Sequence, residues 1–329
     1  MALSATCKAL LKLLADGQFH SGTDLAAAVG ISRSAVWKHL QSLETLGLTL
    51  TAVSGKGYRL PQALELLDAT TIRQALPPRS TELLQQLQLH DVIASTNSHL
   101  MTYARQGAAN AVACLAEYQS AGRGRRGKRW VSPYGHNIYL SLLWHYQSGP
   151  AILSGLSLAV GVGVMRVLRQ YGIEDAGLKW PNDIYWHGRK LAGILIEVSG
   201  ESSGPCHAVI GVGLNVHIAA DQGQSIDQAW VDLQHILGTG LPSRNALAAS
   251  LLDALLAIVC DFDAKTSSAY RQEWRQYDCM QGLPATITIG TQQIHGIVQG
   301  IDDDGLLLMS DENGELRRFA SGEVSLKAS

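Results

Sequence analysis

The sequence predicts an α+β chain of three domains, and three observations support this fold class. The first 60 residues have helical hydrophobic spacing and then a short β-rich stretch, residues 80–275 mix strands with helices, and the remainder alternates short strands with Gly and Asp turns. A length of 329 residues suits two or three domains. We therefore expect domains at 1–63, 64–276 and 277–329.

The N-terminal residues follow the order helix, helix–turn–helix, hairpin. Leucines at helical spacing in "CKALLKLLAD" give a first helix. Thr23 is a plausible N-cap for a short second helix that Gly30 closes, and a third helix runs from an N-cap at Ser32 to a stop at Gly47. "LTLTAVSGKGYRLP" then supplies two β-rich stretches around a glycine turn. This order predicts a winged helix-turn-helix.

The charge of this N-terminal domain favours a nucleic-acid partner. Residues 1–63 carry six Lys or Arg against three Asp or Glu, although the whole chain has a net charge of −2. A helical adaptor that packs on the next domain is the alternative. The candidate DNA contacts are Ser32, Arg33, Ser34, Trp37 and Lys38 on the third helix, with Lys56 and Arg59 on the hairpin.

Cysteine usage and hydropathy bound the environment of the chain. Five cysteines without a C-x-x-C pair argue against a disulfide framework or a zinc site and suit a reducing cytoplasm. The longest apolar run, at 152–168, contains two serines, three glycines and Arg166, so a buried helix explains it better than a membrane span. We expect a cytoplasmic protein with no membrane partner.

An arginine-rich glycine loop is the most unusual feature of the middle domain. In "EYQSAGRGRRGKRW" three glycines spell G-x-G-x-x-G, the pattern of dinucleotide-binding loops. The strand before the loop is present, but the helix that should follow is replaced by Pro133, Gly135 and another strand, which argues against a nicotinamide oxidoreductase. No Gly-Lys-Ser/Thr ending for a phosphate-binding P-loop is present either. A loop that a phosphate or carboxylate orders is the better interpretation, with a solvated basic loop as the alternative.

Two further stretches bear on a binding site. "GLKWPNDIYWHGRKLAGILIE" (177–197) predicts a strand, a Trp-Pro-Asn-Asp turn and a second strand that carries Lys190. Lys190 is either an edge residue with its ammonium in water or a functional cation. "VIGVGLNV" places Gly211 and Gly213 on a strand, where glycine indicates close approach of a ligand or packing against a helix.

Taken in order, these motifs resemble those of biotin–protein ligases, specifically the bifunctional type that also represses the biotin operon. The resemblance covers essentially the whole chain, including the "GKGYRL" hairpin of the repressor-bearing subset. It implies a winged helix-turn-helix, a central mixed β-sheet with helices of the class II synthetase-like biotin/lipoate ligase fold, and a small SH3-like β-barrel. The motifs that carry it are "STN" (95–97), "EYQSAGRGRRGKRW" (117–130), "KWPND" (179–183), "RKLAGIL" (189–195) and "GVGLN" (211–215).

The resemblance also implies an activity. Such enzymes use ATP and Mg²⁺ to convert biotin to biotinyl-5′-AMP and then transfer biotin to a lysine of the biotin carboxyl carrier protein of acetyl-CoA carboxylase. Biotinyl-AMP is also the corepressor that promotes a homodimer on operator DNA. A lipoate–protein ligase and a non-catalytic biotin-sensing repressor are the alternatives.

Site residues follow from the same resemblance. Lys190 and Arg125 are the expected catalytic cations, and Asp183 either holds the metal or orients the acceptor lysine. The expected biotin-binding residues are Ser95, Thr96, Asn97, Gln119, Arg123, Gly124, Arg125, Lys190, Gly211 and Gly213. The expected adenylate-binding residues are Arg123, Arg125, Arg126, Trp130, Asn182, Lys190 and Asn215. The loop 122–130 is expected to close as a lid over the adenylate and, with 149–153, to order the dimer surface.

Overall fold

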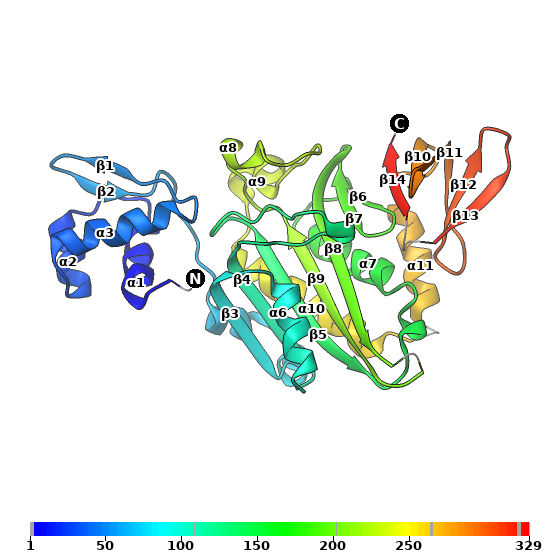
Figure 1. Cartoon of the computed structure of the whole chain (residues 1–329), viewed down its shortest axis with the longest axis horizontal. Helices are drawn as coiled ribbons and strands as arrows, with labels where there is room; N and C mark the ends of the chain where they lie inside the picture. Colours follow the sequence, from blue (N-terminus) through cyan, green and yellow to red (C-terminus); the bar gives the residue numbers. More distant parts are fainter. Residues whose placement is uncertain (1–2, 108, 202, 264–265, 321–323, 329) are drawn as a thin grey trace.

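The protein is described here from a computed structural model that covers residues 3–107, 109–201, 203–263, 266–320 and 324–328. Three parts follow one another along the long axis of the molecule: a small N-terminal head, a central body built on a large sheet, and a C-terminal β-unit (Figure 1). The α+β class predicted from the sequence is confirmed.

The head has three helices and a two-stranded hairpin. Its core is formed by leucines of the helices, including Leu10, Leu14, Leu25, Leu40 and Leu43, all nearly inaccessible to solvent. The elements are α1 (Ala5–Leu14), α2 (Gly22–Val29), α3 (Arg33–Glu44), β1 (Thr51–Val53) and β2 (Gly57–Arg59).

The N-cap of α2 is Ser21, so the prediction of Thr23 was wrong. The Ser21 side chain accepts a hydrogen bond from the Asp24 amide, 3.0 Å away. The helix begins earlier than predicted because His20 exchanges two backbone hydrogen bonds of 2.9 Å with Tyr58 of the hairpin, which holds the chain extended up to that point. The sequence correctly predicted Ser32 as the N-cap of α3.

The body contains a seven-stranded mixed sheet in the order β3-β4-β5-β9-β8-β7-β6. β3 and β4 are parallel and every other neighbouring pair is antiparallel. The strands are β3 (Gln86–Ile93), β4 (Val112–Gln119), β5 (Ile138–Tyr146), β6 (Ala176–Lys179), β7 (Asp183–Trp186), β8 (Arg189–Gly200) and β9 (Cys206–Leu214).

The segment around Lys190 forms two hairpins, not the single one expected. β6 turns into the short strand β7, which turns again at His187 and Gly188, both with positive φ, into β8. Four residues are too few to show an alternating pattern, so β7 was not predicted. Asp183 therefore begins a strand beside β8 instead of ending a turn.

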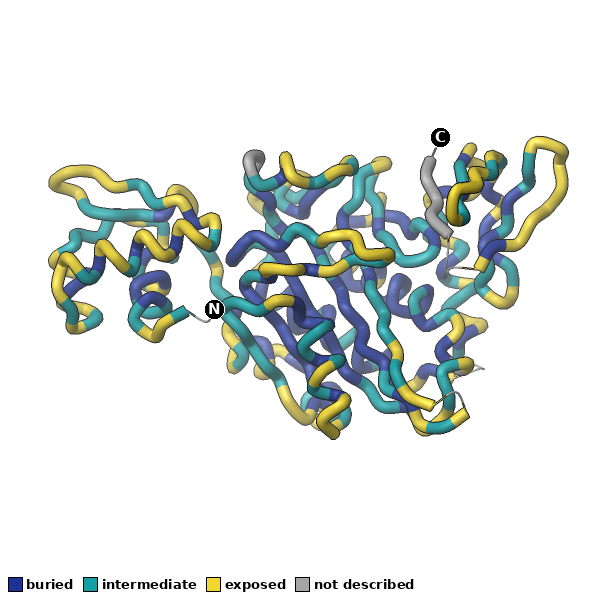
Figure 2. Tube along the Cα trace, viewed as in Figure 1, coloured by how far each residue is buried: buried dark blue, intermediate teal, exposed yellow. Residues whose placement is uncertain are grey.

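Helices cover both faces of this sheet. α7 and α10 pack on one face with the main hydrophobic core, and α6 packs on the other face against Val112, Cys114, Leu143 and Val209 (Figures 1 and 2). The helices are α4 (Ala69–Ala75), α5 (Pro78–Leu83), α6 (Thr96–Arg105), α7 (Leu156–Gln170), α8 (Ala220–Gly223), α9 (Leu233–Leu237), α10 (Arg244–Asp261) and α11 (Thr266–Tyr277), with 3₁₀ turns at Arg125–Gly127, Pro150–Leu153 and Gly238–Gly240.

In the described part of the chain, no single helix has both the length and the apolar character that crossing a membrane requires; the pair Leu233–Gly240 and Arg244–Asp261, bent by 119°, meets the test only when taken together.

The C-terminal unit is a five-stranded antiparallel sheet in the order β13-β12-β11-β10-β14. Trp180 of the body donates a 3.1 Å hydrogen bond from its indole nitrogen to the Gly305 carbonyl, which joins this unit to the central sheet. The strands are β10 (Pro284–Ile289), β11 (Gln292–Ile301), β12 (Leu307–Asp311), β13 (Leu316–Phe319) and β14 (Val324–Ala328).

A buried ion pair fixes the segment that leaves the head. Arg244, the first residue of α10, lies 2.8 Å from Glu117 of β4, and both side chains are about 95% buried. Glu117 also accepts a hydrogen bond from the Leu67 amide, and Arg244 donates to the carbonyls of Glu65 and Asn137. The connecting segment is therefore bound to both the sheet and a core helix.

The head also contacts the body directly. Tyr134, 1% exposed, belongs to the core of the head although it lies in the body, and Val92 and Tyr118 pack against the same cluster. Lys8 of α1 forms a 2.9 Å ion pair with Asp91 of β3.

Breaking the buried pair should destabilise the protein strongly. Arg244→Leu and Glu117→Leu should each lower the free energy of unfolding by about 3–5 kcal/mol, since each leaves one buried charge unpaired. The double variant should lose less than the sum of the two, because no charge is then left uncompensated. Chemical denaturation would measure this, with Arg79→Leu of the exposed Arg79–Asp261 pair as a control expected to cost about 0–1 kcal/mol. Additive losses would contradict the interpretation.

Candidate functional site

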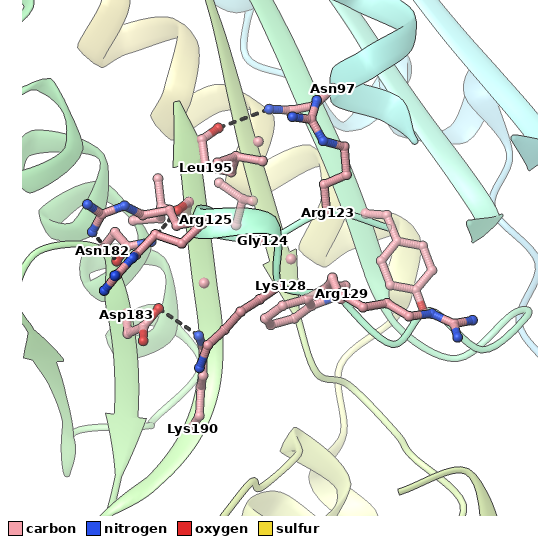
Figure 3. A pocket seen from close by; sticks show the side chains of 18 of the residues that line it. Asn97, Arg123, Gly124, Arg125, Lys128, Arg129, Asn182, Asp183, Lys190 and Leu195 are labelled. Carbon is pink, nitrogen blue, oxygen red and sulfur yellow. Dashed lines mark hydrogen bonds and ion pairs between the residues drawn. The ribbon is translucent and has the colours of Figure 1, made fainter. Parts of the chain in front are cut away.

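A cavity of about 430 Å³ lies beside the sheet, between the start of α6 and strands β7, β8 and β9, with the arginine–glycine loop along it (Figure 3). The structure brings nearly all of the expected site residues together here. Those that line the cavity are Ser95, Thr96, Asn97, Gln119, Arg123, Gly124, Arg125, Arg126, Trp130, Asn182, Asp183, Lys190, Gly211 and Gly213.

One wall of the cavity is polar but uncharged. Gln119, at the end of β4, accepts a 2.9 Å hydrogen bond from the Thr96 amide. The Ser141 hydroxyl lies 2.7 Å from the Thr96 hydroxyl and 2.6 Å from the Asn97 side-chain oxygen. Because all four side chains are buried, these bonds hold each amide and hydroxyl in a fixed orientation.

The two glycines of β9 are required by neighbouring side chains of the site. A Cβ on Gly211 would lie 2.2 Å from the Asn97 side-chain oxygen, and one on Gly213 would lie 2.5 Å from the Trp130 ring. Gly211 thus makes room for a residue of helix α6, and Gly213 makes room for the tryptophan that ends the arginine–glycine loop. Packing against a helix, one of the two interpretations of these glycines, thus holds for Gly211, and close approach of a ligand stays a prediction.

The opposite wall is strongly cationic. Seven Lys or Arg side chains line the cavity, against the two carboxylates Asp183 and Asp227. Burial lowers the pKa of Lys179, which the nearby Lys190 ammonium lowers further and Asp183 partly offsets. Burial likewise lowers the pKa of the Arg125 guanidinium. The site therefore holds excess positive charge where water screens it poorly.

Lys190 lies at the centre of this cationic wall. Its ammonium is 2.7 Å from Asp183, with only 14% of the lysine side chain exposed, and it lies 5.6 Å from the centre of the Trp130 ring (Figure 3). The interpretation of Lys190 as an edge residue in water is therefore wrong, and its charge is directed into the cavity.

The arginine–glycine loop is anchored at several points. The Gly124 amide donates to the Lys128 carbonyl over 2.7 Å, and the Trp130 amide donates to the Gly122 carbonyl over 2.9 Å. Arg123 pairs with Glu197 at 2.8 Å. The helix that would follow a dinucleotide-binding loop is replaced by the extended segment leading to β5, as predicted.

Arg125 connects the loop to the far side of the cavity. Its guanidinium donates a 3.2 Å hydrogen bond to the side-chain oxygen of Asn182. The side-chain nitrogen of Asn182 in turn donates to the Ile194 carbonyl at 2.6 Å. Arg126 has a φ of 56° and an exposed side chain.

A second cavity, of about 240 Å³, shares Trp130 and Lys190 with the first. Asn215 lines this cavity and not the first; its side chain donates a 3.1 Å hydrogen bond to the Val231 carbonyl. Residues 225–228 and Trp230 form the remaining wall, although no motif in the sequence assigns this segment to the site.

Sequence reasoning missed several lining residues of the larger cavity, among them Ser141, Lys179 and Asp227. Ser141 is a polar residue within the apolar strand "IYLSLLW", which is a usable signal. Lys179 belongs to the "KWPND" motif but was given no role. Asp227 follows no recognisable pattern.

The candidate DNA contacts form an exposed face on the head. Arg33, Ser34, Trp37 and Lys38 are all exposed, and Trp37 is 49% accessible despite its size. Figure 2 shows exposed residues along this helix of the head.

The hairpin contacts differ from one another. Lys56 is exposed at the tip, with its ammonium 5.8 Å from the centre of the Phe19 ring. Arg59 is only partly exposed and packs its guanidinium over the same ring at 4.7 Å.

Comparison with family models matches each of the three parts. Residues 8–59 match the HTH domain family, 89–215 match the biotin/lipoate A/B protein ligase family, and 284–327 match the biotin protein ligase C-terminal domain. Together with the cavity, these define a protein ligase of the biotin/lipoate type that carries a helix-turn-helix domain and an SH3-like C-terminal unit.

Relatives extend the match to nearly the whole chain. The bifunctional ligase/repressor BirA of Salmonella typhimurium is 41% identical over 97% of each chain. The protein of the same name from Escherichia coli is 40% identical over 97% of this chain and 96% of its own. The chain therefore belongs to the family of bifunctional ligase/repressors.

A solved structure supports the fold of the body and C-terminal unit. The biotin protein ligase of Aquifex aeolicus, in complex with biotin and ATP, is 25% identical with a TM-score of 0.63, covering 75% of this chain and 100% of its own.

Enlarging Gly213 should strain the site measurably. Gly213→Ala should lower the free energy of unfolding by about 1–3 kcal/mol, because the added methyl overlaps the Trp130 ring. In a Trp130→Ala background the same change should cost little. Thermal or urea denaturation would compare both with Gly240→Ala, where an added Cβ meets nothing within 4 Å. Equal costs in the two backgrounds would mean that Trp130 is not the obstacle.

Proposed function

We propose that this chain joins biotin to ATP to form biotinyl-5′-AMP and pyrophosphate, and then transfers biotin to a lysine of the biotin carboxyl carrier protein of acetyl-CoA carboxylase. One observation carries the proposal: the same cavity is lined by a group of buried, uncharged polar side chains and by seven cationic ones. Biotin has an uncharged ureido ring at one end and a carboxylate at the other, and the carboxylate must meet an anionic phosphate. The division of the cavity suits such a ligand.

The polar wall would receive the ureido ring. Ser95, Thr96, Asn97 and Gln119 offer buried hydroxyl and amide groups, and hydrogen bonds to Gln119 hold Thr96. Such a wall can recognise an uncharged polar ring without a counter-charge. Gly211 and Gly213 line the same cavity and let Asn97 and Trp130, two of the candidate ligand contacts, lie close to β9.

The cationic wall would stabilise the adenylation step. A carboxylate oxygen of biotin attacks the α-phosphorus of ATP, the bond to the pyrophosphate breaks, and negative charge accumulates on the oxygens between them. Lys190, Arg123 and Arg125 are the cations placed to offset that charge, because fixed charges in a poorly hydrated site need no reorganisation during the reaction. Arg126, Asn182 and Asn215 lie beyond them as candidate contacts for the nucleotide, with Trp130 as a face for the adenine.

Asp183 fits either of two roles. Its carboxylate lines the cavity beside Lys190, as does Asp227 elsewhere in the wall, and carboxylate oxygens are the ligands that Mg²⁺ takes alongside phosphate oxygens. Mg²⁺ would neutralise the leaving pyrophosphate. In the second half-reaction the same carboxylate is placed to orient the incoming lysine of the carrier protein.

The loop 122–130 would act as a lid that excludes water from the mixed anhydride. Its arginines contact Glu197 of β8 and Asn182 before β7, and such contacts would hold the loop over a bound ligand. Gly124, between Arg123 and Arg125, would act as a hinge of this loop.

Lys190→Ala should slow formation of the acyl-adenylate by about 10²–10³-fold, while biotin binding changes much less, because the lysine charge is needed most in the transition state. Radiolabelled ATP with biotin or with lipoate would detect the product and distinguish the two ligase classes; the wild type should accept only biotin. Lys12→Ala, an exposed change on α1, is the matched control. Normal adenylation with poor biotin affinity would place Lys190 in ground-state binding. No acyl-AMP from the wild type would favour a non-catalytic sensor.

We further propose that the head binds the biotin operator through the N-terminal end of α3, with Ser32, Arg33, Ser34 and Trp37 facing the bases. Lys38, Lys56 and Arg59 are the candidates for the phosphates. The exposed tryptophan supports this assignment, since a large apolar side chain left in water usually marks an interaction surface.

Arg33→Ala should weaken binding to the operator by about 1–3 kcal/mol and leave binding to unrelated DNA nearly unchanged. Lys56→Ala should weaken both and reduce the salt dependence by about one phosphate contact. Fluorescence anisotropy over a range of salt concentrations would measure both. Equal losses for the two DNA sequences in Arg33→Ala would remove that residue from base recognition.

A homodimer promoted by biotinyl-AMP would complete the repressor, because one winged helix covers too short a site for specific repression. The loops 122–130 and 149–153 are the segments we propose to be ordered at its surface. Sedimentation with and without biotin plus ATP should show a higher association constant when the adenylate forms. An unchanged constant would require another switch.

A further inference from the structure

A second group of reactive side chains lies on the opposite side of β4 from the core helices. His90 of β3, His99 of α6 and Cys114 of β4 place one donor atom each within 4.8 Å of one another. Gln88 and Cys114 are paired in the β3–β4 register, so His90 shares their face of the sheet, and α6 packs on that face. None of these residues lines either cavity described above.

One of the three donor residues has a buried nitrogen without a hydrogen-bond partner. The Nε2 atom of His90 is buried and has no hydrogen-bond partner in the described structure. His99 Nε2 lies 2.7 Å from the Gln88 side-chain oxygen, and the two imidazole rings are 4.9 Å apart in an edge-to-face arrangement. An unpartnered buried nitrogen is costly, and a bound cation would satisfy it.

Burial shifts the pKa of all three donor groups. It lowers the pKa of His90 and of His99, which favours the neutral imidazole, the form that binds metals. Burial raises the pKa of the Cys114 thiol to about 12, so the metal must displace its proton, which leaves to solvent. His90 and His99 are only partly buried, which leaves a path for an ion from the surface.

We propose that His90, His99 and Cys114 form a binding site for a zinc ion, with water or the Gln88 side-chain oxygen as the fourth ligand. Two imidazole nitrogens and one thiolate are a set that zinc prefers. Bond lengths of about 2.0–2.3 Å place tetrahedral donors about 3.3–3.7 Å apart. Side-chain rotations that move the donor atoms by about 1 Å would therefore close the site. The ion would tie α6 to the two strands beneath it.

The cysteine spacing argued against a zinc site because such sites are recognised by C-x-x-C pairs. Here the donors come from two strands and a helix that are separated in sequence, so no short motif records them.

Cobalt substitution tests the proposal on the full-length protein. After removal of metals with a chelator, Co²⁺ should produce a thiolate-to-cobalt charge-transfer band and the visible bands of a tetrahedral ion, at one equivalent per chain. Zn²⁺ should displace the cobalt spectrum and raise the Tm, since it binds the native state. Cys114→Ser and His99→Gln should each abolish the thiolate band and reduce the Zn²⁺-induced rise in Tm.

The chain offers matched controls. His145 and His207 face each other across β5 and β9 with their rings 4.2 Å apart, whereas Cys206 precedes His207 on the strand and points to the other face. His145→Gln and Cys206→Ser should therefore leave the cobalt spectrum and the Zn²⁺ response unchanged. His99→Gln changes a partly exposed residue, so its metal-free Tm should stay near wild type even if Cys114→Ser lowers it. Absence of a thiolate band in the wild type, or its persistence in Cys114→Ser, would overturn the proposal.

Discussion

The buried pair of Glu117 and Arg244 is the interaction on which the connection between the head and the body depends. It joins the end of β4 to the start of α10, and both residues also bind the backbone of the segment that leaves the head. The attraction between the two charges alone would barely offset the free energy lost when both are removed from water. Additional hydrogen bonds to Leu67, Glu65 and Asn137 stabilise the two charges, although Nε of Arg244 has no partner in the described structure, and these directional bonds fix a position that an apolar contact would leave free to slide.

Three consecutive residues at the end of β4 each contact a different part of the molecule. Glu117 binds the connecting segment, Tyr118 packs against the core of the head, and Gln119 orients the polar wall of the cavity. The chain returns after the arginine–glycine loop and reinforces the same point, since the Gly135 amide donates to the Glu117 carbonyl at 3.0 Å and Tyr134 enters the head core. A displacement of this strand end would therefore be felt at the ligand site and at the head together.

The sequence predicted the elements that have strong periodicity, and failed where order comes from tertiary contacts. The long strands and α7 and α10 are evident from their apolar runs. The start of α2 was misplaced because a hairpin contact, not local capping preference, ends the extended segment at His20. β7 is too short for a pattern and is defined by its neighbours.

The site shows the same division. Motif residues gathered as expected, whereas Asp227 and the segment to Trp230 join the site only because a long connection folds back beside Trp130. Asn215 lines the smaller cavity because its side chain is bound to this returning segment. Contacts of this kind depend on the path of the chain and leave no local signal.

The electrostatics of the larger cavity account for the contacts that its cations make. A chain with a net charge of −2 gathers seven cationic side chains around one cavity with only two carboxylates among them. Their mutual repulsion is relieved in part by Asp183 beside Lys190, by Glu197 beside Arg123 and by the Asn182 amide beside Arg125. A neutral ligand would gain nothing from this surplus, whereas an anion that becomes more negative during the reaction gains most at the moment of greatest charge. The repulsion among these cations thus destabilises the folded chain, and it would be offset only when phosphate and carboxylate groups occupy the cavity.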